Sequence, residues 1–280
     1  MGVLSNKIER DQLKPGDHIY SWRYYCLYTH HGIYVGEGKV IHFTQGEGHK
    51  IGTGTVLDRI NSSSSPSPPI STECEICGDQ SRLDGVISSC IDCFLSGGNL
   101  YLFEYGVSRA FHLASARGGT CTLAKSDPPE DVLHRAFYLL QNGFGGYNLF
   151  KNNCEDFAIY CKTGLLVETA ISVGRSGQEV AFQAAKSAVM SSTLTFLTTR
   201  VRRLAVGGLA VTGLAVGGLA AVSYGSYCIS RLVSDIGVRH DVVKVPADRL
   251  VDQSHLCDPQ AAVDIPTPSR ILVVWQLKVW

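Results

Sequence analysis

One cysteine stands where a reactive thiol would be expected. Cys154 follows Asn152 and Asn153, and either asparagine can cap a helix that begins at the cysteine. In the first turn of a helix, unpaired backbone N–H groups and the helix dipole stabilise a thiolate, and they can also stabilise an oxyanion. Free cysteines are more often small buried apolar residues, and Cys161, which has no cap nearby, is interpreted in that way. The capped position makes Cys154 the candidate nucleophile.

A cysteine nucleophile needs a base, and the chain has nine histidines. Three of them, His30, His31 and His42, flank one predicted hairpin with a glycine-rich connection. A three-residue turn would place His42 on the same face as His30, whereas a two-residue turn would place it with His31. Spacing alone leaves both pairings open. A strand histidine is also more often a half-exposed polar residue than a catalytic one.

Two further pairs of cysteines have the spacing of a metal site. The pairs are Cys74 with Cys77 and Cys90 with Cys93, and twelve residues lie between them. Such pairs can place four sulfur atoms around a tetrahedral zinc ion. A closed set of four thiolates leaves no open coordination position, so we predict a structural zinc ion and no cofactor for catalysis. The alternative is a group of reduced surface thiols or a redox-sensitive pair.

The elements that would position these residues are strands early in the chain and helices later. Runs rich in strand formers cover 17–22, 31–35, 39–43, 100–105, 111–114 and 120–123. Helices are predicted after Pro128, over 152–164 and over 178–203. A serine- and proline-rich loop, 61–69, opens the segment 61–97 that holds the four paired cysteines.

Composition limits the class of protein. The 280 residues include 25 basic and 25 acidic side chains, so there is no net basic charge to attract nucleic acid. A hydrophobic fraction of 45% is sufficient for a folded core. The N-terminus lacks the apolar run of a signal peptide, so the ten cysteines are expected to be reduced thiols of a cytoplasmic protein.

An uncharged, Gly- and Ala-rich run extends from Leu204 to Ser230, with Arg203 before it and Arg231 after it. At about 1.5 Å per residue, a helix of this length can cross a bilayer. Its many glycines favour the alternative of a helical pair buried in a soluble protein. We predict a membrane-associated helical region over 174–233, with the catalytic domain on the cytosolic side. No structure is assigned to the tail, 234–280.

The segments Thr29–Gly36 and Asn153–Phe157, with His42 between them, resemble the lecithin retinol acyltransferase domain, also called the NC domain. The resemblance covers about residues 13–164. In that family a histidine precedes an aromatic or similar residue in the first motif, so His30 takes the histidine place, which agrees with the three-residue turn. The four-cysteine segment, absent from the animal enzymes, is similar to plant members of the family.

The resemblance implies an α+β fold of the circularly permuted papain-like (NlpC-type) kind, in which an antiparallel sheet packs on helices. Residues 13–164 would form the catalytic domain, with a C-terminal apolar helical segment beyond it. The family roles carry over to Cys154 as nucleophile, His30 as general base and His42 as the residue that orients and polarises His30. Asp156 departs from the family, because the best-known animal members have histidine there. That position is not catalytic in the family.

The implied function is thiol acyl transfer or hydrolysis on phospholipid acyl esters, through a thioester on Cys154. Two alternatives are an amidase or peptidase on the same fold, and a non-catalytic membrane-bound interaction module. An intact set of Cys154, His30 and His42 argues against the module, which would not need it. The predicted partners are therefore a phospholipid or other acyl ester and a membrane, and not nucleic acid. The sequence does not identify the acyl acceptor or a protein partner.

Overall fold

The computed structural model describes residues 6–23, 28–45, 74–80, 83–115, 118–147, 152–167 and 224–250. Four predicted segments lie outside these residues: the loop 61–69, the helix 178–203, the part of the apolar run over 204–223, and the tail from residue 251.

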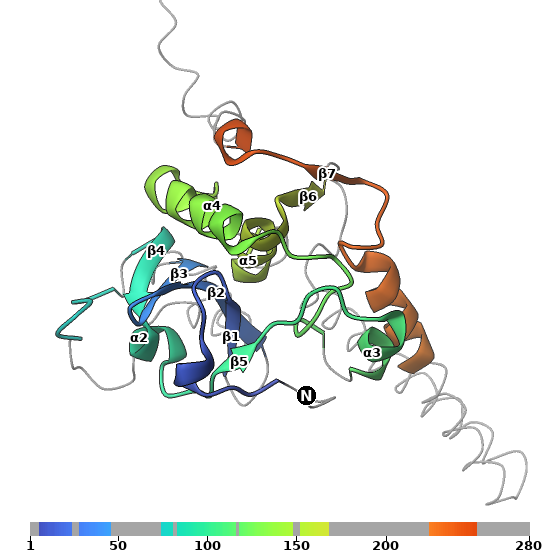
Figure 1. Ribbon diagram of the computed structural model, residues 1–280, viewed down its shortest axis with the longest axis horizontal. Helices are drawn as coiled ribbons and strands as arrows, with labels where there is room; N and C mark the ends of the chain where they lie inside the picture. Colours follow the sequence, from blue (N-terminus) through green and yellow to red (C-terminus); the bar gives the residue numbers. More distant parts are fainter. Residues whose placement is uncertain are drawn as a thin grey trace, which may run out of the picture.

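A five-stranded antiparallel sheet forms the centre of the fold, with the strand order β4-β3-β2-β1-β5 (Figure 1). The predicted strands at 17–22, 31–35 and 39–43 are confirmed as the three central strands, and the run at 100–105 contains only a short edge strand. The strands are β1 (His18–Arg23), β2 (Tyr28–Gly36), β3 (Lys39–Thr44), β4 (Gly85–Cys90) and β5 (Tyr101–Leu102).

The turn between β2 and β3 sets which histidines share a face. The turn has two residues, Glu37 and Gly38, with φ angles of 50° and 68°. The predicted three-residue turn is therefore wrong. A bulge at Val35 in β2 supplies the extra residue, however, so that His42 still pairs with Gly32. The bulge thus restores the register that the three-residue turn would have given.

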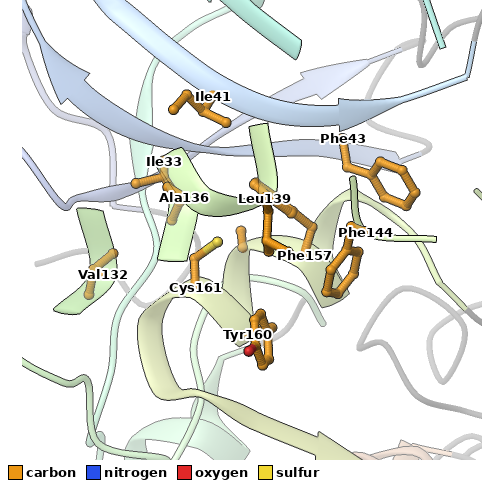
Figure 2. Packing of buried hydrophobic residues seen from close by; sticks show 11 residues of the cluster. Ile33, Ile41, Phe43, Val132, Ala136, Leu139, Phe144, Phe157, Tyr160 and Cys161 are labelled. Carbon is orange, nitrogen blue, oxygen red and sulfur yellow. The ribbon is translucent and has the colours of Figure 1, made fainter. Parts of the chain in front are cut away.

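Two helices, α4 (Pro129–Asn142) and α5 (Cys154–Thr163), pack against one face of the sheet (Figure 1). Ile33 of β2 and Ile41 of β3 point towards them, and Cys161 is buried in the same cluster, as predicted (Figure 2). The cluster consists of Ile33, Ile41, Phe43, Val132, Ala136, Leu139, Phe144, Phe157, Ala158, Tyr160 and Cys161.

The short helix α2 (Ile91–Leu95) covers the other face of the sheet. Its residues Phe94 and Leu95 pack with Ile19 of β1 and Val40 of β3. Strand alternation therefore decides which helix each side chain of β2 can reach, because neighbouring residues point to opposite faces.

Three segments between the hairpin and α4 differ from the sequence-based expectations. Residues 111–114 were predicted as a strand but belong to helix α3 (Arg109–Ala114), because Ser108 caps that helix by accepting the N–H of Phe111 at 3.2 Å. A short apolar run does not by itself distinguish a strand from a helix. The run 120–123 contributes one bridge, between Glu104 and Cys121, rather than a strand. Strand β4 and helix α2 were not predicted.

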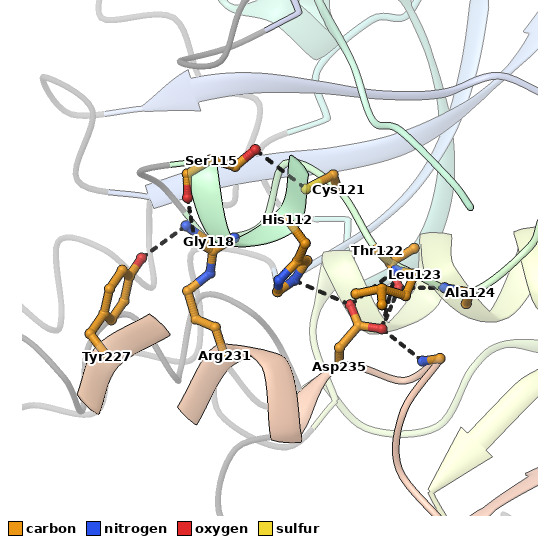
Figure 3. Close-up of polar contacts among 11 residues, drawn as sticks. His112, Ser115, Gly118, Cys121, Thr122, Leu123, Ala124, Tyr227, Arg231 and Asp235 are labelled. Atoms are coloured by element: carbon orange, nitrogen blue, oxygen red, sulfur yellow. Dashed lines mark hydrogen bonds and ion pairs between the residues drawn. The ribbon is translucent and has the colours of Figure 1, made fainter. Parts of the chain in front are cut away.

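The chain packs on the same domain again at residues 224–250. Residues 224–234 are helical, and β7 (Val242–Lys244) pairs antiparallel with β6 (Leu165–Val167). Asp235 accepts hydrogen bonds from Thr122 Oγ1 at 3.0 Å and from the N–H of Leu123 at 3.2 Å (Figure 3). The end of the predicted apolar run, 224–230, is thus part of a helix that packs on the domain.

Candidate active site

Cys154 is the first residue of α5, and Asn153 caps the helix. Asn153 Oδ1 accepts the N–H groups of Glu155 at 2.8 Å and of Asp156 at 3.2 Å. Asp156 Oδ2 in turn accepts the N–H of Asn153 at 3.1 Å, which completes a capping box. The predicted cap is confirmed, and Asp156, the residue that departs from the family pattern, holds the start of α5.

The Cys154 thiol lies beside the N-terminal part of β2, where β2 is no longer paired with β3. The β2–β3 register ends at Gly32 opposite His42, whereas β2 continues to pair with β1 as far as Tyr28. Cys154 Sγ lies 3.7 Å from the carbonyl oxygen of Thr29, and it also faces the N–H of His31. The sulfur therefore contacts the backbone on both sides of His30.

A chain of buried hydrogen bonds runs from His30 away from the thiol. His30 Nε2 lies 3.0 Å from His42 Nδ1, and His42 Nε2 lies 2.8 Å from Ser89 Oγ on β4. The other ring nitrogen, His30 Nδ1, is buried and has no hydrogen-bond partner within the described ranges. We call these three residues the open chain, because it ends in a ring nitrogen that is available to a proton.

Burial sets the charge state of the site. It raises the pKa of the Cys154 thiol to about 12, although the His31 N–H and the Tyr147 side chain act in the opposite direction. Burial also lowers the pKa of His30, with the neighbouring His42 and Arg23 acting in the same direction, and it lowers that of His42 to about 3. At neutral pH the thiol and both imidazoles are therefore uncharged. Burial thus opposes the stabilisation of a resting thiolate that is expected at the helix start.

Two residues that no sequence signal indicated complete this face. The Arg23 guanidinium donates to the carbonyl oxygens of Phe94 and Leu95. The Phe94 ring lies 5.3 Å from the ring of His30 and 5.5 Å from that of His42, measured between centroids. Their contacts join β1, α2 and the histidines, which are distant in sequence, so local patterns could not reveal them.

The opposite face of β2 carries a second hydrogen-bonded chain. His31 Nδ1 lies 2.8 Å from His18 Nε2, and His31 Nε2 lies 2.7 Å from Thr29 Oγ1. His18 Nδ1 continues the chain to the hydroxyl of Tyr105 at 2.7 Å. We call these four residues the closed chain, because every ring nitrogen in it has a partner. The structure thus places His30, and not His31, on the face of His42.

The four paired cysteines come together at the junction of β4 and α2. Their sulfur atoms all lie within 4.8 Å of one another, and the Cys74 and Cys90 sulfurs are 3.7 Å apart. Zinc–sulfur bonds of about 2.3 Å in a tetrahedron place sulfurs about 3.8 Å apart. All four cysteines are free of disulfides, and Cys77 Sγ accepts the N–H of Cys90 at 3.0 Å. These residues fit a tetrahedral divalent cation.

The ionisation of these thiols also favours a bound cation. Backbone N–H groups of Cys77 and Ile76 lower the pKa of Cys74 to about 7. Burial raises the pKa of Cys93, and hydrogen bonds to Cys74 and Cys90 raise it further. Four thiols at this separation cannot all ionise without a positive charge among them, and a divalent cation supplies it.

Comparison with known proteins agrees with this geometry. The family model described as lecithin retinol acyltransferase matches residues 11–167, which is more than half of the chain. The chain is also 51% identical over 276 residues to Protein LEAD-SENSITIVE 1 of Arabidopsis thaliana, covering 96% of this chain and 100% of that protein.

Proposed function

The chain belongs to the lecithin retinol acyltransferase family, and on this premise we propose that it is a thiol acyltransferase or acyl hydrolase of phospholipid esters. The family supports acyl transfer as the class of reaction. The observation that carries the proposal is the position of His30. Its Nδ1 has no hydrogen-bond partner in the described residues, and the backbone groups of its neighbours Thr29 and His31 contact the Cys154 sulfur. His112 Nδ1 is also buried without a partner in the described residues, so the position of His30 beside the sulfur, and not the unpaired nitrogen alone, supports the proposal.

In the proposed first step, Cys154 Sγ attacks the ester carbonyl while its proton passes to His30 Nδ1. Proton transfer must accompany attack, because the pKa of the thiol is about 12 and that of His30 is lowered by burial. The tetrahedral intermediate then collapses, the carbon–oxygen bond breaks, and His30 returns the proton to the departing lysophospholipid oxygen. Water or an acceptor alcohol or amine next attacks the thioester, with His30 as base, and releases the thiol.

The start of α5 offers a donor for the oxyanion in this scheme. The N–H groups of Glu155 and Asp156 are occupied by the Asn153 side chain, and that of Phe157 bonds to the Asn153 carbonyl at 3.0 Å. The N–H of Cys154 itself is the remaining group of the first turn, adjacent to the reacting sulfur. We assign it as an oxyanion donor.

The order of the site residues fits the proposed circularly permuted papain-like fold. The histidines of β2 and β3 precede α5 and its cysteine in the chain. An amidase or peptidase would use the same site, so the nature of the substrate must be measured. A non-catalytic interaction module would not need Cys154, His30 and His42 together as a set.

The direct test is capture of the acyl-enzyme. Purified protein is exposed briefly to a short-chain phosphatidylcholine and examined by intact-protein mass spectrometry. We expect an added acyl mass that hydroxylamine removes, absent in Cys154→Ser and retained in the matched control Cys228→Ser. A phospholipid that never acylates the wild type, combined with turnover of an acyl amide, would favour the amidase alternative.

We also propose one structural zinc ion on the four paired cysteines, without a role in the chemical step. Metal analysis of purified protein should find about one equivalent, which is lost when Cys77 and Cys93 are both replaced by serine. Protein that is free of metal and equally stable would contradict this proposal.

Membrane association through the apolar run is the last part of the proposal. Within the described ranges, no helix combines the length and apolar character needed to span a bilayer. The run over 204–223 lies outside these ranges, whereas residues 224–250, which follow it, pack on the domain. We propose that this run holds the protein on a membrane, because it is uncharged and apolar over a length that can reach across a bilayer.

Flotation with phosphatidylcholine vesicles tests this segment. We expect the wild type to float, and a variant with Val211→Asp and Leu214→Asp to remain in the aqueous fraction while keeping Cys154 reactive. If both proteins behave alike, the run does not hold the protein on the membrane.

A further inference from the structure

The four-cysteine site and the open chain share one segment of the protein. Cys90 ends β4, and the residue before it, Ser89, is the partner of His42. Cys93 lies in α2, and the residue after it, Phe94, packs on the rings of His30 and His42. Each metal-ligand candidate in this segment is thus next to a residue that touches the histidines.

Ser89 can accept or donate a hydrogen bond at His42 Nε2, and the proposed direction of the open chain is the one in which it accepts. When its hydroxyl accepts a proton from His42 Nε2, His42 Nδ1 must accept from His30 Nε2. His30 Nδ1 is then left with a lone pair, which a base needs. The geometry is consistent with this role, because Ser89 is 2% exposed and its Oγ lies 2.8 Å from His42 Nε2.

The segment that carries Ser89 and Phe94 depends on contacts outside itself. Helix α2 has five residues, too few to be stable as an isolated helix. At the C-terminal end of α2, Arg23 donates hydrogen bonds to the carbonyl oxygens of Phe94 and Leu95. The N-terminal end of α2 holds Cys90 and Cys93, which meet Cys74 and Cys77. A metal ion on the four sulfurs would fix that end to the strand.

We propose that Ser89 is a positioning residue for the His30–His42 pair, and that metal in the four-cysteine site holds Ser89 and Phe94 against it. Metal occupancy then controls how reactive the Cys154 thiol is. This inference rests on the proposed roles of Cys154 and His30, but it does not depend on a phospholipid being the substrate.

The rate at which iodoacetamide alkylates Cys154 is the readout, because it needs no substrate. Peptide-level mass spectrometry follows Cys154 separately from the other cysteines in the full-length protein. We expect Ser89→Ala to lower the rate about tenfold, the lower end of the cost of losing an outer-shell partner. Ser89→Thr, which retains the hydroxyl, should restore most of the rate. His30→Ala defines the slowest rate that the site can show.

The matched control is Ser88→Ala, one residue away on the opposite face of β4, where Ser88 pairs with Ile41. It should leave the rate unchanged. Thermal unfolding of every variant separates a positioning effect from loss of the fold. If folded Ser89→Ala reacts as fast as the wild type, or if Ser89→Thr is as slow as Ser89→Ala, the positioning role is refuted.

The metal arm compares protein treated with a zinc chelator against the same protein reloaded with Zn²⁺. Stripping should slow Cys154 alkylation in the wild type to about the rate of Ser89→Ala, and Zn²⁺ should restore it. In Ser89→Ala, stripping should have little further effect, because the Ser89 contact, which accounts for most of the coupling, is already absent. Equal losses on stripping in both proteins would overturn the coupling through Ser89.

Failure of the proposed function gives a different pattern. If no phospholipid acylates Cys154 but its alkylation still follows Ser89 and Zn²⁺, the substrate assignment is wrong and the coupling stands. If alkylation is the same in wild type and His30→Ala, the proposed base is wrong, and this inference falls with it.

Discussion

The open chain and the closed chain both contain two histidines that are joined by a hydrogen bond, but their hydrogen bonding differs. In the closed chain, His18 and His31 have partners on all four ring nitrogens, from the Tyr105 hydroxyl to Thr29 Oγ1. In the open chain, His42 is bonded at both nitrogens but His30 at only one. All four rings are buried and sit on adjacent strands. The difference is therefore neither residue type nor burial, but one unpaired atom.

This unpaired atom distinguishes a histidine pair that stabilises the fold from one that can take up a proton. A fully paired buried network lowers the energy of the fold, and removing a member leaves its neighbours without partners. A buried nitrogen without a partner costs stability, and a catalytic role is one reason for a protein to retain such a group. Under the proposed function, His30 serves the reaction and His31 serves stability, on the two faces of one strand.

The largest expected effect is on catalysis, from the open chain. His30→Ala removes the proton acceptor and should lower turnover by roughly four orders of magnitude, as losses of a catalytic base do in other enzymes. His42→Ala should leave measurable activity, because His42 orients the base and does not take the thiol proton. Turnover of labelled phosphatidylcholine measures both, with unfolding in urea as the control for structure. Wild-type turnover in His30→Ala would place the base elsewhere.

The same substitution in the closed chain should act mainly on stability. His31→Ala leaves His18 Nε2 and Thr29 Oγ1 without this partner and creates a cavity, so the free energy of unfolding should fall by about 3 to 5 kcal/mol. Activity per folded molecule should remain within a few-fold of wild type, because His31 points away from His42. Urea unfolding and turnover, measured on one preparation, test both statements. An inactive but stable His31→Ala would invert the comparison.

Acid should destabilise the protein through both chains. Burial lowers the pKa of His18 and His30, and it lowers those of His31 and His42 to about 3, from an ordinary value of 6.5. The unfolded chain therefore binds more protons below pH 6.5, and stability falls as the pH falls through that value. Each histidine contributes up to about 1.4 kcal/mol per pH unit.

Urea unfolding at several values between pH 7 and pH 5 measures this slope. The double variant His30→Ala/His42→Ala should show about half the wild-type pH dependence, because the closed chain remains intact. An unchanged slope would mean that the open chain does not stay neutral in the folded protein.

The smallest effect is expected when the closed chain loses its last hydrogen bond, the one between His31 and Thr29. Thr29→Val removes the hydroxyl that bonds to His31 Nε2 but keeps the backbone carbonyl that contacts Cys154 Sγ. Stability should fall by about 1 to 2 kcal/mol, the cost of one unsatisfied buried group, with turnover unchanged. Thermal unfolding and turnover check this, and Thr29→Ser, which retains the hydroxyl, should stay closer to wild type.

Local patterns were sufficient where the deciding contacts are local. The cap of α5 is an interaction between residues two and three apart, so Asn153 and Cys154 were recognised from the sequence. The cysteine pairs are close in sequence as well. The strand prediction for 111–114 was wrong because a run of four residues fits either a strand or a helix, and the cap at Ser108 favours the helix. Strand β4 and helix α2 are both short, and their stability comes from packing on other elements.

The choice between His30 and His31 shows where sequence reasoning stops. Alternation along β2 established that only one of them could share a face with His42, but which one depended on the turn and on a bulge at Val35. The turn prediction was wrong while the resulting register was right, because the bulge and the shorter turn compensate each other. A bulge is set by how the two strands pack, which alternation does not encode.

By itself, the sequence determined the family, a capped cysteine at the start of a helix, a set of histidines on one hairpin, and two cysteine pairs with metal-site spacing. Only the tertiary structure decided that His30 ends in an unpaired nitrogen, that Ser89 holds His42, and that the four cysteines meet beside both. The physical reason is the distance along the chain between the residues that interact. Caps and periodicity act over a few residues, whereas the contact of His42 with Ser89 joins residues 47 positions apart and exists only once β3 and β4 have paired.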